Sequence, residues 1–362
     1  MEWKHLTKED TALYKGIGIL LIVGHNFFHW VAPSTGENEF VFDAGLVKKL
    51  ASLLVQQPLE SINLALSYFG HYGVGIFIFL SGYGLARSRA GGNGSGAGTV
   101  GWFSFMNSRV RRIYPGFALA VVLYIVFEYF RTSALPPPDT LKELVLKLSL
   151  LASFFPDQAL SVNGPWWFYS FIFQCYAVFP LLAHVHRRLG PAGLWAAAAA
   201  GLIFIAVFNP MLTGHGVNAL QMAAGHLPEF CLGIYLAGRR EQKLNGAWLL
   251  VAAAIFVLGN LFRPAWHLSF LSCLVLVLAG LQVIVPMIRR RPALGAVIAY
   301  YGIISMYLFA CHGFLRGPFV YIANKHTSPV ITLMLGAAFL LAATAVAQLM
   351  MAAGKIRRQR FF

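Results

Sequence analysis

A lysine and a histidine bracket an apolar run near the start of the chain. Lys15 and His25 enclose nine residues, all of them glycine or aliphatic. In an α-helix these ten steps rise about 15 Å, so a Lys15 ammonium at the membrane edge places His25 near mid-depth. A histidine in hydrocarbon usually faces the protein interior and is a candidate for function. A neutral imidazole, with an ordinary pKa of about 6.5, could accept a proton from a hydroxyl group; a buried histidine satisfied by a neighbour is the alternative.

Two further ionisable groups lie inside apolar segments. Glu229 is about 15 Å from the Arg239 end of its segment, which again places it near mid-depth. It could orient an imidazole or a sugar hydroxyl, or it could pair with a buried cation. His312 falls near the outer end of a later segment, where an acceptor-binding, an interfacial and a purely structural role are all open.

His29 follows His25 by one helical turn, and a His-x-x-x-His pair can bind a metal ion. No third ligand lies nearby in the sequence, and the adjacent Trp30 is typical of the aromatic belt at a membrane interface. We therefore expect no metal here. The four cysteines are single residues inside apolar segments, so we expect neither disulfides nor zinc binding by them.

Several polar and aromatic side chains interrupt the other apolar segments. Ser81, Gln174 and Tyr176 could hydrogen-bond between helices, or they could contact a substrate. Trp166 and Trp167 stand where an aromatic belt is expected, and they could instead stack on a sugar ring.

The composition shows which elements must position these groups. Of 362 residues, 58% are hydrophobic and only 11% are charged, which leaves too little polar surface for a soluble protein. We predict an all-α, polytopic integral membrane protein with a single transmembrane domain over residues 1–362. About ten stretches are long enough to cross a bilayer. They are 12–32, 64–86, 113–131, 165–185, 192–209, 218–238, 246–262, 267–288, 294–315 and 329–353.

The basic residues predict the orientation of these spans. The net charge is +15, and 20 of the 28 lysines and arginines fall on one face if the spans alternate in direction. Because cytoplasmic loops are enriched in these residues, both termini and the Gly-rich loop at 91–101 are predicted to be cytoplasmic. Loops 33–63 and 132–164 are then outer loops, the second with an amphipathic helix at 139–153. This clustering explains the basic charge without a nucleic-acid partner.

Six short motifs follow one another over residues 15–315. They are Lys15-Gly16-Ile17 with His25, Phe79-Leu80-Ser81-Gly82-Tyr83, Arg109-Val110-Arg111-Arg112-Ile113-Tyr114-Pro115, Trp167-Phe168-Tyr169-Ser170, Leu227-Pro228-Glu229-Phe230, and Ser305-Met306-Tyr307-Leu308 with His312. In type and order they resemble motifs of the membrane-bound acyltransferase-3 family. The commoner family pattern has its basic residue eleven positions before the histidine. Lys15 is ten before His25, and that turns it about 80° from the expected face.

The resemblance implies transfer of an acetyl or other acyl group from acyl-CoA, a substrate rather than a permanently bound cofactor, to a hydroxyl group. His25 and Glu229 are then the candidate catalytic residues. Four cations could hold the CoA phosphates. They are Lys15, Arg109, Arg111 and Arg112. For the arginines, cytoplasmic charge bias alone is the alternative explanation.

The resemblance also implies an acceptor on a cell-surface or exported glycan and a location in a bacterial inner membrane, with O-acetylation as the outcome. Ser81, Trp166, Trp167, Gln174, Tyr176 and His312 are the candidate acceptor contacts. Ile172 and Phe173 stand where paired glutamates are common in the family, which points to a different acceptor.

A transporter or flippase is the competing class of protein. A mid-membrane histidine and glutamate would also suit a proton-coupled carrier of an acylated or anionic molecule. Such carriers often contain inverted repeats, and the sequence shows no repeat.

Overall fold

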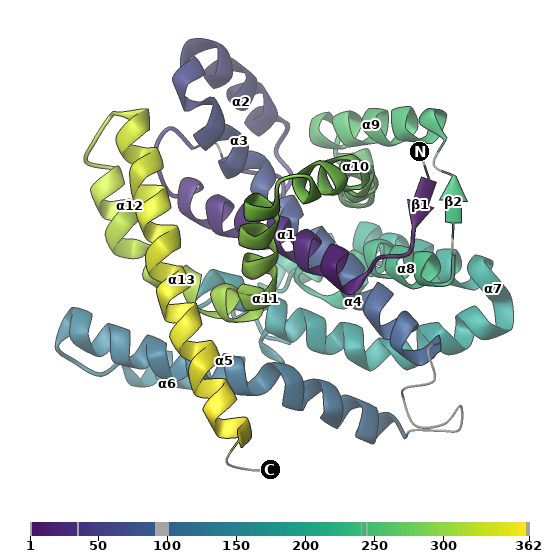
Figure 1. Cartoon of the computed structure of the whole chain (residues 1–362), viewed down its shortest axis with the longest axis horizontal. Helices are drawn as coiled ribbons and strands as arrows, with labels where there is room; N and C mark the ends of the chain where they lie inside the picture. Colours follow the sequence, from purple (N-terminus) through teal and green to yellow (C-terminus); the bar gives the residue numbers. More distant parts are fainter. Residues whose placement is uncertain (1, 35, 91–100, 240, 244, 360–362) are drawn as a thin grey trace.

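The protein is a bundle of α-helices with one short pair of strands (Figure 1). The computed structural model describes residues 2–34, 36–90, 101–239, 241–243 and 245–359. The elements in chain order are β1 (Glu2–Lys4), α1 (Lys8–Phe28), α2 (Ala44–Gln56), α3 (Ser61–Phe69), α4 (Gly73–Ala90), α5 (Trp102–Thr132), α6 (Pro138–Leu148), α7 (Trp167–Gly214), α8 (Leu227–Ala237), β2 (Glu241–Lys243), α9 (Gly246–Leu261), α10 (Arg263–Arg289), α11 (Pro292–Leu315), α12 (Gly317–Ala323) and α13 (Pro329–Gln359). Strands β1 and β2 pair in antiparallel fashion, with Glu2 opposite Lys243.

Among the described residues, seven helical segments are long and apolar enough to cross a membrane. They are Lys8–Phe28, Pro58–Arg89, Trp102–Thr132, Gly164–Gly214, Arg263–Arg289, Pro292–Leu315 and Pro329–Gly354. The fourth contains a break at Gly190, where φ is 63°, and the two predicted spans 165–185 and 192–209 lie on either side of it. Helix α9 is apolar but only 16 residues long. The prediction of membrane-spanning helices is therefore confirmed, and the count of ten stays a prediction.

The predicted span at 218–238 is not one helix. Ala219–Gln221 and Ala223–His226 form two 3₁₀ turns, and only the 11 residues of α8 are α-helical. Gly225 permits this fold because a Cβ there would lie 2.6 Å from the Ala219 carbonyl oxygen. Pro228 then occupies the first turn of α8, where the missing N–H is no loss. Hydropathy cannot distinguish such a packed turn from a helix, and the turn carries His226 and Glu229 into the protein interior.

The two loops that are predicted to be outer loops contain helices of their own. Loop 33–63 includes α2, and the predicted amphipathic helix at 139–153 is present as α6. Helix α6 ends at Leu148, five residues earlier than predicted, and Leu150 has a positive φ of 62°. The Gly-rich loop predicted at 91–101 lies outside the described residues except for Gly101.

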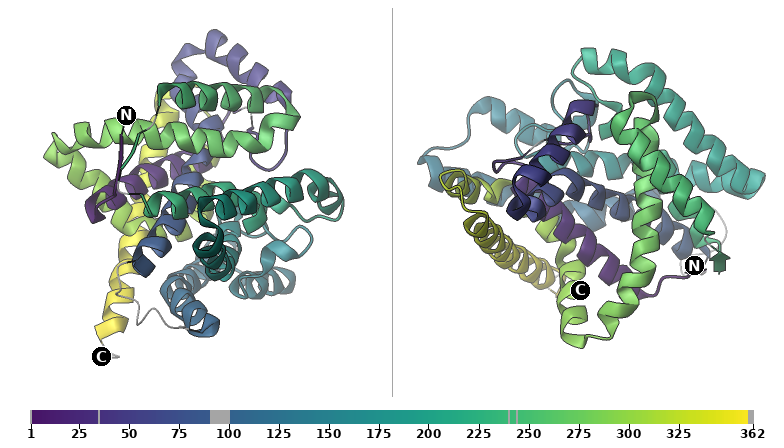
Figure 2. Two further views of the ribbon diagram at one scale, coloured as in Figure 1. Left: turned by 90° about the vertical axis from the view of Figure 1, so that its right-hand side faces the viewer. Right: turned by 90° about the horizontal axis from the view of Figure 1, so that it is seen from above.

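Helix α1 is flanked by other helices on both sides (Figure 2) and packs most closely against α11. Two glycines permit this contact. A Cβ on Gly16 would lie 1.9 Å from the carbonyl oxygen of Ile298, and a Cβ on Gly302 would lie 1.9 Å from that of Ala12. Small residues at a helix crossing let the backbones approach closely. The van der Waals contact that results holds the helices together, because lipid supplies no hydrophobic driving force between them. This contact fixes the depth and rotation of α1, and with them the places of Lys15 and His25.

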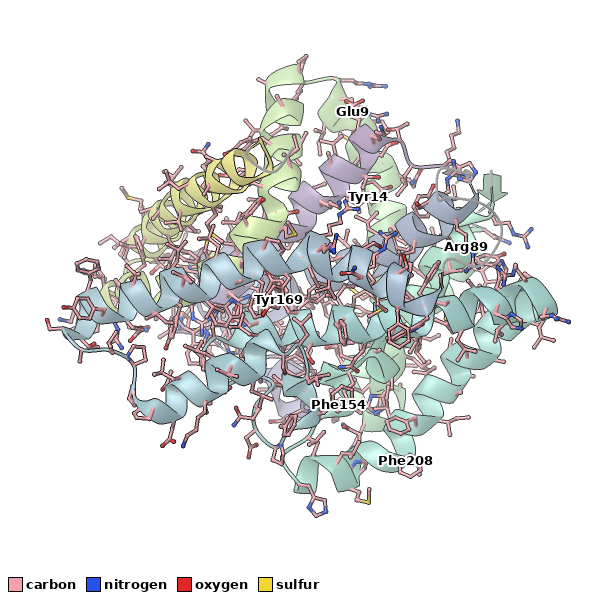
Figure 3. All side chains as sticks on the ribbon, turned by 90° about the horizontal axis from the view of Figure 1, so that it is seen from below. Glu9, Tyr14, Arg89, Phe154, Tyr169 and Phe208 are labelled. Carbon is pink, nitrogen blue, oxygen red and sulfur yellow. The ribbon has the colours of Figure 1, made fainter. Side chains whose placement is uncertain are left out.

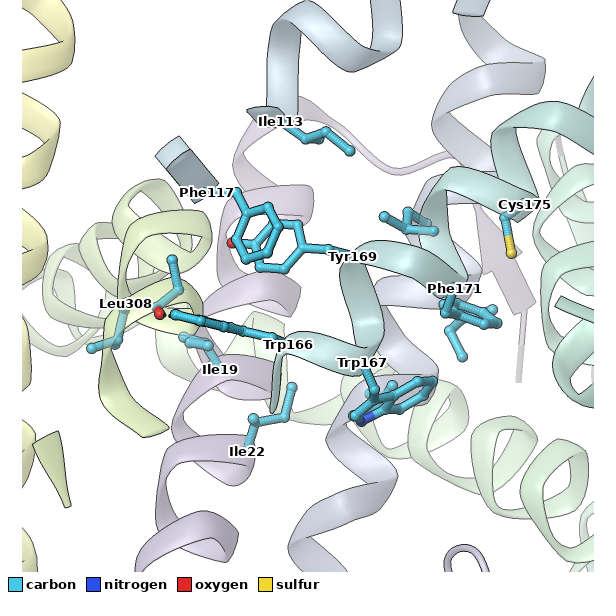
Figure 4. Close-up of a cluster of buried hydrophobic side chains, with 14 of the residues drawn as sticks. Ile19, Ile22, Ile113, Phe117, Trp166, Trp167, Tyr169, Phe171, Cys175 and Leu308 are labelled. Atoms are coloured by element: carbon cyan, nitrogen blue, oxygen red, sulfur yellow. Dashed lines mark hydrogen bonds between the residues drawn. The ribbon is translucent and has the colours of Figure 1, made fainter. Parts of the chain in front are cut away.

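Aromatic side chains fill the space between α5, α7 and α11. Figure 3 shows Tyr169 near the centre of the molecule and Phe208 near its edge, in agreement with their exposures of 4% and 44%. Tyr169 stacks on Phe117 with ring centroids 4.0 Å apart. The Trp166 indole N–H donates a 2.8 Å hydrogen bond to the Ala310 carbonyl oxygen, and its ring lies edge-on to Phe117 within the same cluster (Figure 4). This cluster holds the start of α7 against α5 and α11.

Replacing Gly302 by alanine should destabilise the fold, because the new methyl group meets the α1 backbone and the helices must move apart. We expect a loss of about 1–3 kcal/mol in the free energy of unfolding, typical of an overpacked contact. Gly84→Ala is the matched control, since a Cβ there meets nothing within 4 Å. Thermal unfolding of the purified variants in detergent measures the difference. Equal melting temperatures for the two variants would contradict the close contact.

Candidate active site

His25 is buried at the end of α1, and its orientation is set by the turn between α3 and α4. Its Nδ1 donates a 2.8 Å hydrogen bond to the Ser67 carbonyl oxygen, so Nε2 is the unprotonated nitrogen of the neutral ring. Gly70 makes this contact possible, because a Cβ there would lie 2.7 Å from that of His25. The imidazole is 7% exposed. It therefore presents one lone pair, in a fixed direction, to the groups beside it.

Glu37, from the loop before α2, lies on the Nε2 side of His25. Its Oε1 is 3.9 Å from His25 Nε2, and its Oε2 is 2.6 Å from Nδ1 of His29. Burial raises the pKa of Glu37, but the contact with His29 and the proximity of the His25 imidazole together outweigh it, so the pKa lies below its ordinary value. Glu37 is thus a carboxylate at neutral pH. Its sequence position, 12 residues after His25 and outside the helix, did not predict this contact.

His71 is a third imidazole in this cluster. Its ring centroid is 5.7 Å from that of His25, and the His25 and His29 centroids are 5.3 Å apart. His71 is 3% exposed, and neither of its ring nitrogens has a hydrogen-bond partner among the described residues. The ligand atoms of His25, His29 and Glu37 all lie within 4.8 Å of one another. These residues could therefore hold a metal ion, with the third ligand supplied by a loop that sequence proximity did not indicate.

A second histidine–carboxylate pair lies on the far side of His71. His226 donates from Nε2 to the Leu220 carbonyl oxygen at 3.1 Å, and its Nδ1 is 3.2 Å from Oε1 of Glu229. One proton is therefore shared between Nδ1 and Oε1. Both residues line a small cavity of about 20 Å³ together with Glu39, His71 and Trp167, among others. The structure thus places Glu229 beside His226 and Trp167, and His71 separates this pair from His25.

Three of the four predicted phosphate ligands come together at the other end of α1. Arg112 lies within electrostatic range of Lys15, and Arg109 and Arg112 both lie within range of Tyr176 on α7. None of the three cations has a salt bridge to a carboxylate in the described part of the chain. Unpaired cations from different helices suit an anion with several oxygens, such as a phosphate.

Arg111 does not belong to this group. Like Arg112 it is exposed, but its Nε donates a 3.1 Å hydrogen bond to Oδ1 of Asn107, one turn earlier on α5. Neighbouring residues of a helix point about 100° apart, so only one of Arg111 and Arg112 can face Lys15.

The remaining predicted residues hold the framework together. The Ser81 hydroxyl donates to the Phe77 carbonyl oxygen within α4, and Trp166 is buried in the aromatic cluster described above. Gln174 donates to the Ser153 hydroxyl and accepts from the Ala223 backbone N–H, so it ties the turn before α8 to α7. His312 hydrogen-bonds carbonyl groups of its own helix through Nδ1, and it lies within electrostatic range of His25.

Comparison with families of known proteins gives a match over residues 13–352 to a family model described as an acyltransferase domain. No curated protein and no solved structure matches the chain. The match includes both ends of the site, from Lys15 to the His25 cluster, and it includes the His226–Glu229 pair.

The position of Glu39 at the cavity can be tested through the pH dependence of stability. Burial, and then the charge of Glu37, raise the pKa of the Glu39 carboxyl well above its ordinary value of 4.5. Ionisation is therefore easier in the unfolded chain, and the folded protein loses stability as the pH rises from about 4.5 toward the folded-state pKa. Glu39→Gln removes this loss, so its melting temperature should exceed that of the native protein increasingly between pH 5 and 8. The exposed Asp139→Asn serves as the control. A pH-independent difference would contradict the enclosed position of Glu39.

Proposed function

The chain belongs to the acyltransferase-3 family, and from this premise we propose that it moves an acetyl or other acyl group from cytoplasmic acyl-CoA to a hydroxyl of a cell-surface or exported glycan. Family membership and the apolar helices make it a membrane acyltransferase. Donor, acceptor and an inner-membrane location are the proposal. The observation that carries it is that one helix, α1, bears a cation group at Lys15 and an oriented imidazole at His25.

The cations at the start of α1 would bind the donor phosphates. These cations come from two helices: Arg112 lies near Lys15, and both Arg109 and Arg112 lie near Tyr176. Charge-assisted contacts from such a set hold phosphate oxygens firmly. Lys15 and His25 are ten residues apart, about 15 Å along the helix. A donor held by its phosphates at Lys15 would extend its long pantetheine arm toward His25.

His25 would act as the general base. Its Nε2 lone pair takes the proton of the acceptor hydroxyl while the oxygen attacks the thioester carbonyl carbon. When the tetrahedral intermediate collapses, the carbon–sulfur bond breaks, and the thiolate of CoA receives that proton back from His25. Glu37, a carboxylate 3.9 Å from Nε2, would stabilise the imidazolium between the two steps.

The acceptor would approach from the side of Glu37 and the loop before α2. Trp167 and the His226–Glu229 pair line the cavity next to His71, so they are the nearest candidates for contacts to a sugar ring and its hydroxyl groups. Trp166, Ser81 and Gln174 make internal contacts that favour a supporting role.

Replacing His25 by alanine should abolish most of the activity without unfolding the protein, because a small apolar residue is tolerated at this depth. We expect turnover from acetyl-CoA to fall by about 10²–10⁴-fold, the usual contribution of a general base. His215→Ala is the comparison, since it removes an exposed histidine outside the His25 cluster and should leave turnover unchanged. Transfer of radiolabelled acetyl groups by purified protein measures both. Near-normal transfer by a well-expressed His25→Ala variant would refute the base assignment.

Neutralising Arg112 should weaken donor binding more than neutralising Arg111. Arg112→Gln removes a phosphate contact, so the KM for acyl-CoA should rise roughly 10-fold with little change in the acceptor KM. Arg111→Gln makes the same change in net charge at a side chain that hydrogen-bonds Asn107. Steady-state kinetics in which donor and acceptor concentrations are varied in turn compare the two variants. An unchanged donor KM in both variants, with protein abundance intact, would leave only cytoplasmic charge bias as the role of these arginines.

A further inference from the structure

The His25 cluster has the composition and geometry of a site for a transition-metal ion. Three candidate ligand atoms are mutually within 4.8 Å: Nε2 of His25, Nδ1 of His29 and a carboxylate oxygen of Glu37. Two ligands bound to one zinc ion at about 2.1 Å lie roughly 3.4 Å apart in tetrahedral geometry. The contacts of Glu37 to His29 and to His25, at 2.6 and 3.9 Å, bracket that value. Small side-chain rotations would therefore bring all three onto one ion.

One observation beyond proximity points to a ligand. The His29 Nδ1 and Glu37 Oε2 atoms are 2.6 Å apart and pair with each other, so this observation comes from the third histidine. His71, 3% exposed, leaves both ring nitrogens without a hydrogen-bond partner beside the same cluster, and it lies within electrostatic range of Glu37. His71 therefore lies beside the three candidate ligands with nitrogens that a bound ion or its water could contact, although it is outside the set of atoms within 4.8 Å of one another.

The surroundings of His25 match those of metal-bound histidines. A ligating imidazole usually donates its other ring N–H to a carbonyl or carboxylate, which fixes the ring and the nitrogen that binds. The bond from His25 Nδ1 to the Ser67 carbonyl oxygen does this and leaves Nε2 free. Imidazoles with one carboxylate favour Zn²⁺ over the oxygen-seeking Mg²⁺ and Ca²⁺.

We propose that His25, His29 and Glu37, with His71 beside them, form a Zn²⁺ site whose occupation inhibits the enzyme. This inference rests on the proposed function in one respect, that acyl transfer requires the Nε2 lone pair of His25. The same lone pair cannot serve a metal ion and a hydroxyl proton together. Zinc and acceptor activation are therefore mutually exclusive, and the ion acts as a reversible inhibitor.

Metal binding is measured first, independently of activity. Full-length protein in detergent is stripped with EDTA, loaded with Zn²⁺ or Co²⁺ and desalted, and its metal content and Co²⁺ absorption bands are recorded. We expect about one ion per chain, reduced at least 10-fold in affinity by His29→Ala and by Glu37→Gln. The exposed His215→Ala should bind as the native protein does, because it removes a histidine outside the cluster. The proposed metal site is wrong if the native protein binds no zinc. It is also wrong if both His29→Ala and Glu37→Gln bind zinc as the native protein does.

Inhibition is measured next on the same preparations. Micromolar Zn²⁺ should lower acyl transfer by the native protein at least 10-fold, and EDTA should restore it. His29→Ala, compared with its own zinc-free rate, should lose this sensitivity. Bound zinc without inhibition would overturn the regulatory role. If EDTA-treated native protein binds zinc but transfers no acyl group, the proposed function fails and the metal site stands.

Discussion

The close crossing of α1 and α11 is the constraint on which the site depends. At Gly16 and Gly302 the two backbones approach so closely that neither position has room for a Cβ atom. Lipid does not drive helices together by the hydrophobic effect, so the depth of α1 has to be set by shape and by van der Waals contact. Once α1 is fixed, ten residues of regular helix determine the separation of Lys15 from His25. The distance between the two ends of the site is therefore a property of one rigid element.

Buried polar groups impose a second requirement, because a membrane interior offers no water to satisfy them. His25, Glu37 and His226 each meet it with contacts inside the protein: a carbonyl oxygen, a histidine and a carboxylate. His71 does not. In the described part of the chain, His71 lies beside His25 and lines the cavity that also contains the His226–Glu229 pair. A buried polar side chain without partners usually marks a place where a ligand or a water molecule supplies the missing hydrogen bonds.

Sequence patterns predicted the helices and the candidate residues of α1, but not the partners of those residues. Hydropathy identifies a span such as α10 from composition alone, and the motif around His25 pointed to the end of α1 where the histidine cluster lies. Glu37, His71 and His226 could not be assigned in this way, because their contacts are made between separate segments. The two glutamates Glu37 and Glu39, close together in the loop before α2, were a usable signal. Residues 218–226 were misjudged because a tightly packed 3₁₀ turn is as apolar as a helix.

The pairing of β1 with β2 restricts how many times the chain between them can cross the membrane. Residues 2–4 and 241–243 form one small sheet, so both must lie on the same side of the bilayer. The chain between them has to cross the membrane an even number of times. Three candidate spans precede α7. If α7 crosses the membrane once, the number of crossings is already even. If α7 crosses twice, with its turn at Gly190, the segment at 218–238 must cross as well to keep the number even. Three residues of strand thus restrict the path of more than half the chain.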